Sequence, residues 1–194
     1  MVTSRPILAA VAALPLIFAA ARAADLPRQA PEVLINMIAG NPVRLSQYRG
    51  KVVAMCFILT TCPHCQKTIG YLSQMQNEYG PRGFQVLASA IEQGSAFAVP
   101  RFLQTFKPPF PVGYNDGSVA VEFMQHPQML TPMMPMLAFV DRQGMIRDQH
   151  EGNDEVFFGE QQEQNLRKQI ESMLSAGGRQ STAKKSAAPK KGSE

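Results

Sequence analysis

Residues 51–70 read KVVAMCFILTTCPHCQKTIG, and two structural patterns meet inside this stretch. Residues 51–59 are almost wholly apolar and rich in branched side chains, which is typical of a strand buried on both faces. Over 63–79 the apolar residues recur every three or four positions, a spacing that predicts a helix, and a Gly-Pro pair ends it. Cys62 and Cys65 therefore stand at a junction between a buried strand and a helix.

The rest of the chain continues this alternation of strands and helices. An apolar run at 84–90 predicts a second buried strand, and because a helix joins it to the first strand, we expect the two to be parallel. The whole pattern predicts an α/β fold in which helices flank a central mixed sheet, preceded by a short β extension. The further predicted elements are helices at 96–106, 119–124 and 154–174, strands at 110–114, 136–140 and 145–149, and extended segments at 32–37 and 42–45.

The two ends of the chain differ in composition from its middle. Over 1–23 a basic residue, an apolar run and an Ala-Arg-Ala exit are typical of a secretory signal peptide, so we expect cleavage after Ala23 and a periplasmic protein. The run is short for a membrane span, which makes a retained anchor the less favoured alternative. Residues 24–30 are predicted as a linker, 31–176 as one domain, and 177–194 as a disordered basic tail.

The charge distribution argues against nucleic acid as a partner. The formal net charge is +4, but seven of the 19 basic residues lie in the predicted signal peptide and tail. The body that remains has twelve basic and fourteen acidic residues and is slightly acidic, so we expect no nucleic-acid binding. The lysines of the tail would give only a weak attraction to anionic lipid headgroups.

The sequence Cys62-Pro63-His64-Cys65 predicts a redox-active dithiol. At a helix N-terminus, free backbone N–H groups and the helix dipole favour the Cys62 thiolate, which is the form that attacks disulfides. Cys65 lies one turn later, where it can attack a mixed disulfide on Cys62 and resolve it. Pro63 suits the first turn because its missing N–H would be unpaired there, and a protonated His64 adds positive charge beside the thiolate.

A structural disulfide and half of a metal site are the alternatives to a redox centre. A zinc site would need a second pair of ligands, such as another Cys-x-x-Cys, and none follows in the sequence. His126 and His150 are isolated from each other and from the cysteines. We therefore expect no metal, and no cofactor other than the Cys62–Cys65 disulfide itself.

Three segments together resemble a known family. Residues 43–51, VRLSQYRGK, lead into the first buried strand, CPHC occupies 62–65, and Pro135 precedes an apolar strand and the turn Asp-Arg-Gln-Gly. Over about 31–174 the chain resembles the thioredoxin-like redoxins of the TlpA/ResA type, which are grouped with the alkyl hydroperoxide reductase/thiol-specific antioxidant superfamily. The inner dipeptide Pro-His is the one found in DsbA-type oxidants.

The resemblance implies a thioredoxin-like fold and a thiol–disulfide oxidoreductase with Cys62 as nucleophile and Cys65 as resolving thiol. It also implies that the Met134–Pro135 peptide bond is cis and presents the backbone of Met134 to a substrate chain, the alternative being an ordinary trans proline. The implied partners are protein thiols or disulfides and a membrane-bound or soluble redox partner. The direction stays open, because His64 favours a disulfide donor whereas TlpA/ResA members are usually reductants.

At three positions the chain departs from the family pattern. Thr61 stands where Trp usually precedes the first cysteine, Cys56 where thioredoxins bury an acid, and Thr68 where TlpA/ResA-type sequences often carry Glu. Neither acid that would take a proton from Cys65 is present, and water and Glu92 are the remaining candidates. We interpret Cys56 as a small buried hydrophobic residue, with a third redox thiol as the alternative.

Two other functions are alternatives. Five methionines crowd the segment around Pro135 together with His126, and because thioether and imidazole groups bind copper, a copper chaperone that uses Cys62, Cys65 and these side chains is one of them. The same residues would also serve as core filler or as an adaptable surface for peptides. The second alternative is a thiol peroxidase, although its usual Pro and Thr positions before the reactive cysteine are occupied by other residues. The methionines are Met124, Met129, Met133, Met134 and Met136, and the peroxidase positions hold Met55 and Leu59.

Overall fold

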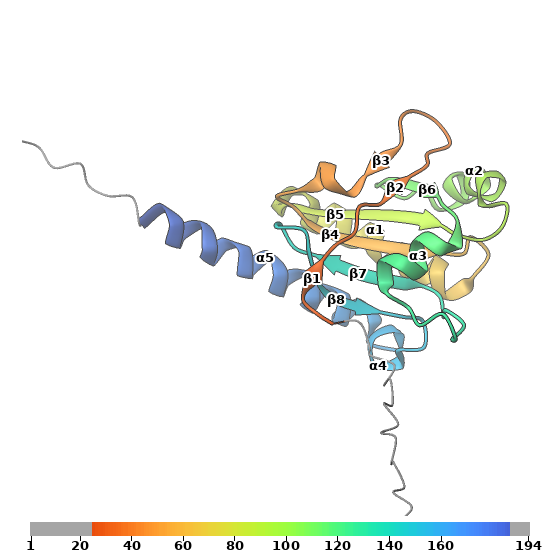
Figure 1. The fold of residues 1–194 in the computed structure, drawn as a ribbon. Coiled ribbons are helices and arrows are strands. Elements are labelled where there is room, and N and C mark those ends of the chain that lie inside the picture. The colour runs from red at the N-terminus through yellow and green to blue at the C-terminus, as the bar shows by residue number, and fades with distance from the viewer. Residues whose placement is uncertain (1–24, 187–194) are drawn as a thin grey trace, which may run out of the picture.

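The computed structural model describes residues 25–186, with side-chain surroundings up to 176. The predicted signal peptide, 1–23, and the end of the predicted tail, 187–194, lie outside the described residues. No helix within the described part of the chain is long and apolar enough to cross a membrane. Figure 1 shows a central sheet with helices on both sides and one long C-terminal helix that runs past the edge of the sheet.

A mixed six-stranded sheet, in the order β1-β8-β7-β4-β5-β6, forms the centre of the fold. The central strand β4 (Val52–Ile58) is parallel to β5 (Phe84–Ala90) and antiparallel to β7 (Met136–Val140). Helix α1 (Pro63–Tyr79) connects β4 to β5, as predicted from the period of its apolar residues. The other strands of this sheet are β1 (Arg28–Gln29), β6 (Val112–Tyr114) and β8 (Met145–His150), and β2 (Leu34–Ile35) pairs with β3 (Val43–Arg44) in a separate small sheet.

Both faces of β4 are covered, and its side chains alternate between two cores. One core lies between the sheet and α1, together with α2 (Ser95–Phe106), α4 (Glu155–Phe158) and α5 (Gln162–Ser186). The other lies under α3 (Gly117–Met124) and the N-terminal segment, which Figure 1 shows in front of the sheet. All seven residues of β4 are buried, which explains why this stretch of sequence is continuously apolar.

Strand β1 lies inside 24–30, the segment predicted as a linker. It pairs with β8, and Arg28 donates hydrogen bonds to the Phe123 carbonyl at 2.6 Å and to the side chain of Gln149 at 2.7 Å. Ala30 is also buried, so the folded domain starts earlier than predicted. A strand of two residues is too short to show an alternating pattern in the sequence, so its position is determined by its tertiary contacts.

The predicted helix at 154–174 is two helices, α4 and α5. Gly159 separates them, and a Cβ at this position would collide with the carbonyl of Glu155. Helix α5 then continues through 177–186, where the sequence predicts a disordered tail. Five of these ten residues are Arg, Gln, Ala or Lys, which favour a helix, and the other five are Gly, Ser or Thr, which do not, so this stretch continues a helix nucleated earlier in α5.

His150, at the end of β8, joins the sheet to α4. Its Nδ1 lies 2.7 Å from Asp154, its Nε2 lies 3.2 Å from Asp148 as an ion pair without hydrogen-bond geometry, and its ring stacks on Phe157 at 3.6 Å. Burial opposes protonation of the ring, but the attraction of the two carboxylates outweighs it and raises the pKa of His150 above its ordinary value.

We expect the free energy of unfolding to fall as the pH rises above about 6.5, the ordinary pKa of histidine. A histidine whose pKa is raised by folding stabilises the protein fully below its unfolded pKa of about 6.5, and this contribution is lost as the pH passes the folded pKa. Urea denaturation at a series of pH values measures the slope, and His150→Gln should flatten it. An unchanged slope in that variant would contradict the role of His150.

Candidate active site

Cys62 caps the N-terminus of α1. Its backbone is extended (φ −76°, ψ 121°), and its Sγ accepts a hydrogen bond from the Cys65 N–H at 3.5 Å. Pro63 occupies the first helical position, as predicted. Cys62 is half-buried, whereas its neighbours Thr61, Pro63 and His64 are exposed. The sulfur is therefore accessible and lies where the helix dipole favours a negative charge.

Cys65 is fully buried one turn further along α1. Its Sγ accepts a hydrogen bond from the Leu59 N–H at 3.5 Å. Burial raises the pKa of Cys65 strongly, the neighbouring Cys62 and Cys56 add to the rise, and only the Leu59 N–H opposes it. At neutral pH Cys65 is therefore a protonated thiol, and its proton must leave before its sulfur can attack.

Cys56 is buried in β4 and belongs to the same core as Cys65. Burial raises the pKa of Cys56 to about 12, so its thiolate is scarce at neutral pH. A buried thiol in apolar surroundings is unreactive. These surroundings favour the interpretation of Cys56 as a small core residue over that of a third redox thiol.

The Met134–Pro135 peptide bond is cis, as the resemblance implies. The next residue, Met136, pairs with Phe57 near the carboxyl end of β4. Pro135 therefore lies at the same end of the sheet as the dithiol, which follows β4. Met134 is partly buried and packs against the same core as Cys62. The fold thus brings the dithiol and Pro135 to the same end of the sheet. The substrate-binding role of Met134 stays a prediction.

A buried polar pair supports the first turns of α1. The Thr68 hydroxyl donates to the His64 carbonyl at 2.9 Å and accepts a hydrogen bond from Gln162 Nε2 at 2.7 Å. Gln162 is only 2% exposed and begins α5, so this contact fixes α5 to the active-site helix. The sequence carries no signal for it, because Gln162 is one polar residue in a largely polar stretch.

Glu92, a candidate base for Cys65, bonds to the loop that precedes the dithiol. It lies just beyond β5, and its Oε1 accepts hydrogen bonds from the Thr60 N–H at 2.8 Å and from the Thr60 hydroxyl. Its Oε2 is buried and has no partner among the described residues. The carboxylate therefore reaches the active-site loop, and its hydrogen bonds go to Thr60 rather than to Cys65.

The methionines of the copper interpretation do not share one environment. Met124 and Met136 are buried in the core under α3, whereas Met129 is 95% and Met133 is 48% exposed. Both ring nitrogens of the buried His126 have partners, Glu151 at 2.8 Å and the Leu130 carbonyl at 3.1 Å. Within the described residues, no three His, Cys, Asp or Glu side chains are grouped to hold a metal ion.

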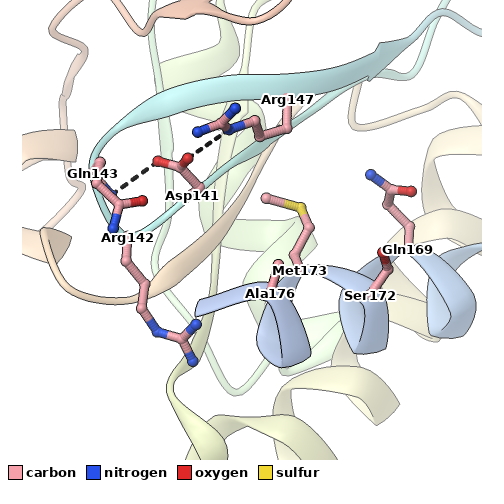
Figure 2. Close-up of a pocket in the computed structure, with 8 residues that line it drawn as sticks. All are labelled: Asp141, Arg142, Gln143, Arg147, Gln169, Ser172, Met173 and Ala176. Atoms are coloured by element: carbon pink, nitrogen blue, oxygen red, sulfur yellow. Dashed lines mark hydrogen bonds and ion pairs between the residues drawn. The ribbon is translucent and has the colours of Figure 1, made fainter. Parts of the chain in front are cut away.

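A cavity at the far end of the sheet contains none of the predicted site residues. Figure 2 shows it between the β7–β8 turn and α5, where Asp141 bonds to Arg147 at 2.6 Å and accepts from the Gln143 N–H at 2.9 Å. The turn follows β7, whereas Pro135 precedes that strand, so the cavity and the dithiol lie at opposite ends. The residues around it are Asp141, Arg142, Gln143, Arg147, Gln169, Ser172, Met173 and Ala176.

The AhpC/TSA family matches residues 26–149, a stretch that includes the dithiol and Pro135. The chain belongs to the AhpC/TSA family. It is 24% identical over 98 residues to the thiol-disulfide oxidoreductase ResA of Bacillus thuringiensis subsp. konkukian, covering 50% of this chain and 56% of that protein. It is 28% identical over 105 residues to ResA of Geobacillus kaustophilus, covering 49% and 60%. The chain thus spans little more than half the length of these curated relatives.

Solved structures share the fold of this AhpC/TSA chain. A thiol:disulfide interchange protein of the thioredoxin family from Chlorobium tepidum TLS superposes with a TM-score of 0.64 at 21% identity, covering 78% of this chain and 99% of that one. A thiol:disulfide interchange protein from Bacteroides sp. gives 0.55 at 18% identity, covering 73% and 91%. The fold is thioredoxin-like, as the resemblance implies.

We expect iodoacetamide to modify Cys62 alone in the reduced, folded protein at about pH 7. Raising the Cys56 pKa from 9.0 to about 12 lowers its thiolate fraction about a thousandfold, and the buried Cys65 is protected in the same way. Mass spectrometry of peptides after timed alkylation measures each site, and alkylation in guanidinium chloride is the control in which all three cysteines react. Modification of Cys65 at the rate of Cys62 would contradict the assigned burial.

Proposed function

We propose that this chain is an exported thiol–disulfide oxidoreductase that acts on protein disulfides or dithiols. The observation that carries the proposal is the pairing of a half-exposed Cys62 at the N-cap of α1 with a buried Cys65 one turn away. The named activity of the ResA relatives supports it. Helix dipole and accessibility favour Cys62 as the attacking sulfur, and burial suits Cys65 to resolution.

The proposed reaction proceeds through one mixed disulfide. The Cys62 thiolate attacks a substrate disulfide, forms a bond to one sulfur and releases the other as a thiolate. Cys65 loses its proton to solvent and attacks Cys62, which forms the Cys62–Cys65 disulfide and releases the second substrate sulfur. The substrate gains two electrons and the dithiol loses two, and the reverse sequence oxidises a substrate dithiol.

The direction in the cell depends on the reduction potential of the Cys62/Cys65 couple. The exposed His64 lies beside the helix N-terminus, and a positive charge there stabilises the reduced, thiolate form, which favours a disulfide donor. A potential near −120 mV would identify an oxidant, and one near −270 mV a reductant. Equilibration with glutathione buffers measures this value directly.

We expect Cys65→Ser to accumulate the mixed disulfide and Cys62→Ser to lose turnover entirely. Without the resolving thiol the covalent intermediate persists, whereas without the nucleophile no intermediate forms. Insulin reduction measures turnover, and non-reducing gels show the trapped species. Cys56→Ser is the matched control, because its buried thiol takes no part and turnover should stay within about twofold of wild type.

Two outcomes of this experiment would overturn the proposed activity. One is full disulfide exchange by Cys62→Ser, which would place the reactive sulfur elsewhere. The other is rapid turnover of peroxide with no exchange on insulin, which would favour the thiol peroxidase alternative. The same protein preparations serve both assays.

Export is proposed from the composition of 1–23, which combines a basic start, an apolar run and an Ala-Arg-Ala exit. The full chain expressed in a bacterial host should be cleaved after Ala23 and recovered in the periplasmic fraction. N-terminal sequencing and fractionation measure both. Replacing Ala21 and Ala23 by bulky residues should block cleavage, and an uncleaved chain that stays in the cytoplasm without this change would contradict export.

A further inference from the structure

The chain lacks an acid at both positions that the family resemblance implies, since Cys56 and Thr68 occupy them. One carboxylate nevertheless reaches the active-site loop from another strand. Backbone pairing of β4 with β5 continues past the strands, because the Ile91 N–H donates to the Ile58 carbonyl at 3.0 Å. Glu92 follows directly, and this pairing aims its side chain at the loop over 59–61.

The backbone N–H, the hydroxyl and the carbonyl of Thr60 each make a hydrogen bond. Its N–H and hydroxyl donate to Oε1 of Glu92, and its carbonyl accepts from Gln66 Nε2 at 2.9 Å. The hydrogen bonds of the Glu92 carboxylate go to Thr60 alone, because Oε2 has no partner within the described residues. Thr60 is 7% exposed, so water does not compete freely for these bonds.

The backbone N–H of Leu59, the residue before Thr60, contacts the resolving thiol of Cys65. The Leu59 N–H donates to Cys65 Sγ at 3.5 Å, and the Leu59 carbonyl accepts from the Cys62 N–H at 3.2 Å. A donor aimed at the Cys65 sulfur stabilises its thiolate, which is the form that resolves the mixed disulfide. The Leu59 N–H belongs to the Ile58–Leu59 peptide, which the Ile91 N–H holds on one side, and the bonds of Thr60 to Glu92 hold the chain on the other side of Leu59.

We propose that Glu92 is a positioning residue for the resolving step: by anchoring Thr60, it keeps Leu59 in place, so that its N–H stays directed at the Cys65 sulfur. This inference rests on the proposed function. In the step it assists, the Cys65 proton leaves to solvent, the Cys62–Cys65 bond forms, and the bond from Cys62 to the substrate breaks with release of a substrate thiolate. Glu92 touches none of the reacting atoms and accepts no proton.

The test compares Glu92→Ala with Glu92→Gln in the full chain. Glu92→Ala removes the acceptor for Thr60, so the rate of mixed-disulfide resolution should fall by on the order of tenfold and its pH profile should move to higher pH. Glu92→Gln keeps an oxygen acceptor and should stay within about threefold of wild type. Stopped-flow decay of a preformed mixed disulfide measures the step, and Glu122→Ala, at an exposed acid on α3, is the matched control.

A second readout separates failure of this inference from failure of the proposed function. In a Cys62→Ser background, the alkylation rate of Cys65 at fixed alkaline pH reports its thiolate without any turnover, and Glu92→Ala should lower it by on the order of tenfold. If wild type exchanges no disulfides, the proposed function fails while this readout still tests Glu92. Should Glu92→Ala not fold, Glu92→Asp, which withdraws the carboxylate by one methylene, replaces it.

Superimposable pH profiles for wild type and Glu92→Ala would overturn the proposal, as would unchanged alkylation of Cys65. Equal impairment of Glu92→Gln and Glu92→Ala would also overturn it, because the charge rather than the acceptor would then be what matters. A slow Glu92→Ala that Glu92→Gln rescues supports it.

Discussion

Strand β4 has no exposed face, and the candidate site depends on this constraint. It pairs with β5 on one side and β7 on the other, and its side chains alternate between two cores. A shift of one residue would move the large Met55 and Phe57 into the space of smaller residues in the other core, which closely packed cores do not tolerate. The strand therefore ends at one place, where the following turn brings Cys62 to the N-terminus of α1 and β7 begins beside it at Pro135.

Long regular patterns in the sequence were enough to predict β4, α1 and β5, whose observed bounds differ from the predicted ones by one residue at most. Contacts between distant segments left no such pattern. Each of three features depends on a partner far along the chain: the two-residue β1, the buried Thr68–Gln162 pair, and the hydrogen bonds that Thr60 donates to Glu92. The cis bond before Pro135 followed from the family resemblance, because its local sequence also suits a trans proline.

The three cysteines differ in burial, and burial separates the accessible thiol from the two enclosed ones. Cys62 is half-buried at a helix end, Cys65 is enclosed but receives a backbone N–H, and Cys56 is enclosed within β4. Burial raises the pKa of both inner cysteines, since burial penalises a charge, and so disfavours their thiolates. A chain with three cysteines thus presents one reactive thiol to a substrate and keeps a second, buried thiol for resolving the mixed disulfide. The carboxylates that the family pattern places near the second thiol are replaced by an uncharged sulfur and a hydroxyl.

Helix α5 begins against the active-site helix, through Gln162, and runs away from the end of the sheet that carries Cys62 (Figure 1). Its 25 residues, at about 1.5 Å each, span about 37 Å. The far end of this helix is consequently a suitable attachment point for a fluorophore or a surface linker. A molecule immobilised there would keep its dithiol open to large substrates, because the helix leads away from the end of the sheet that carries Cys62.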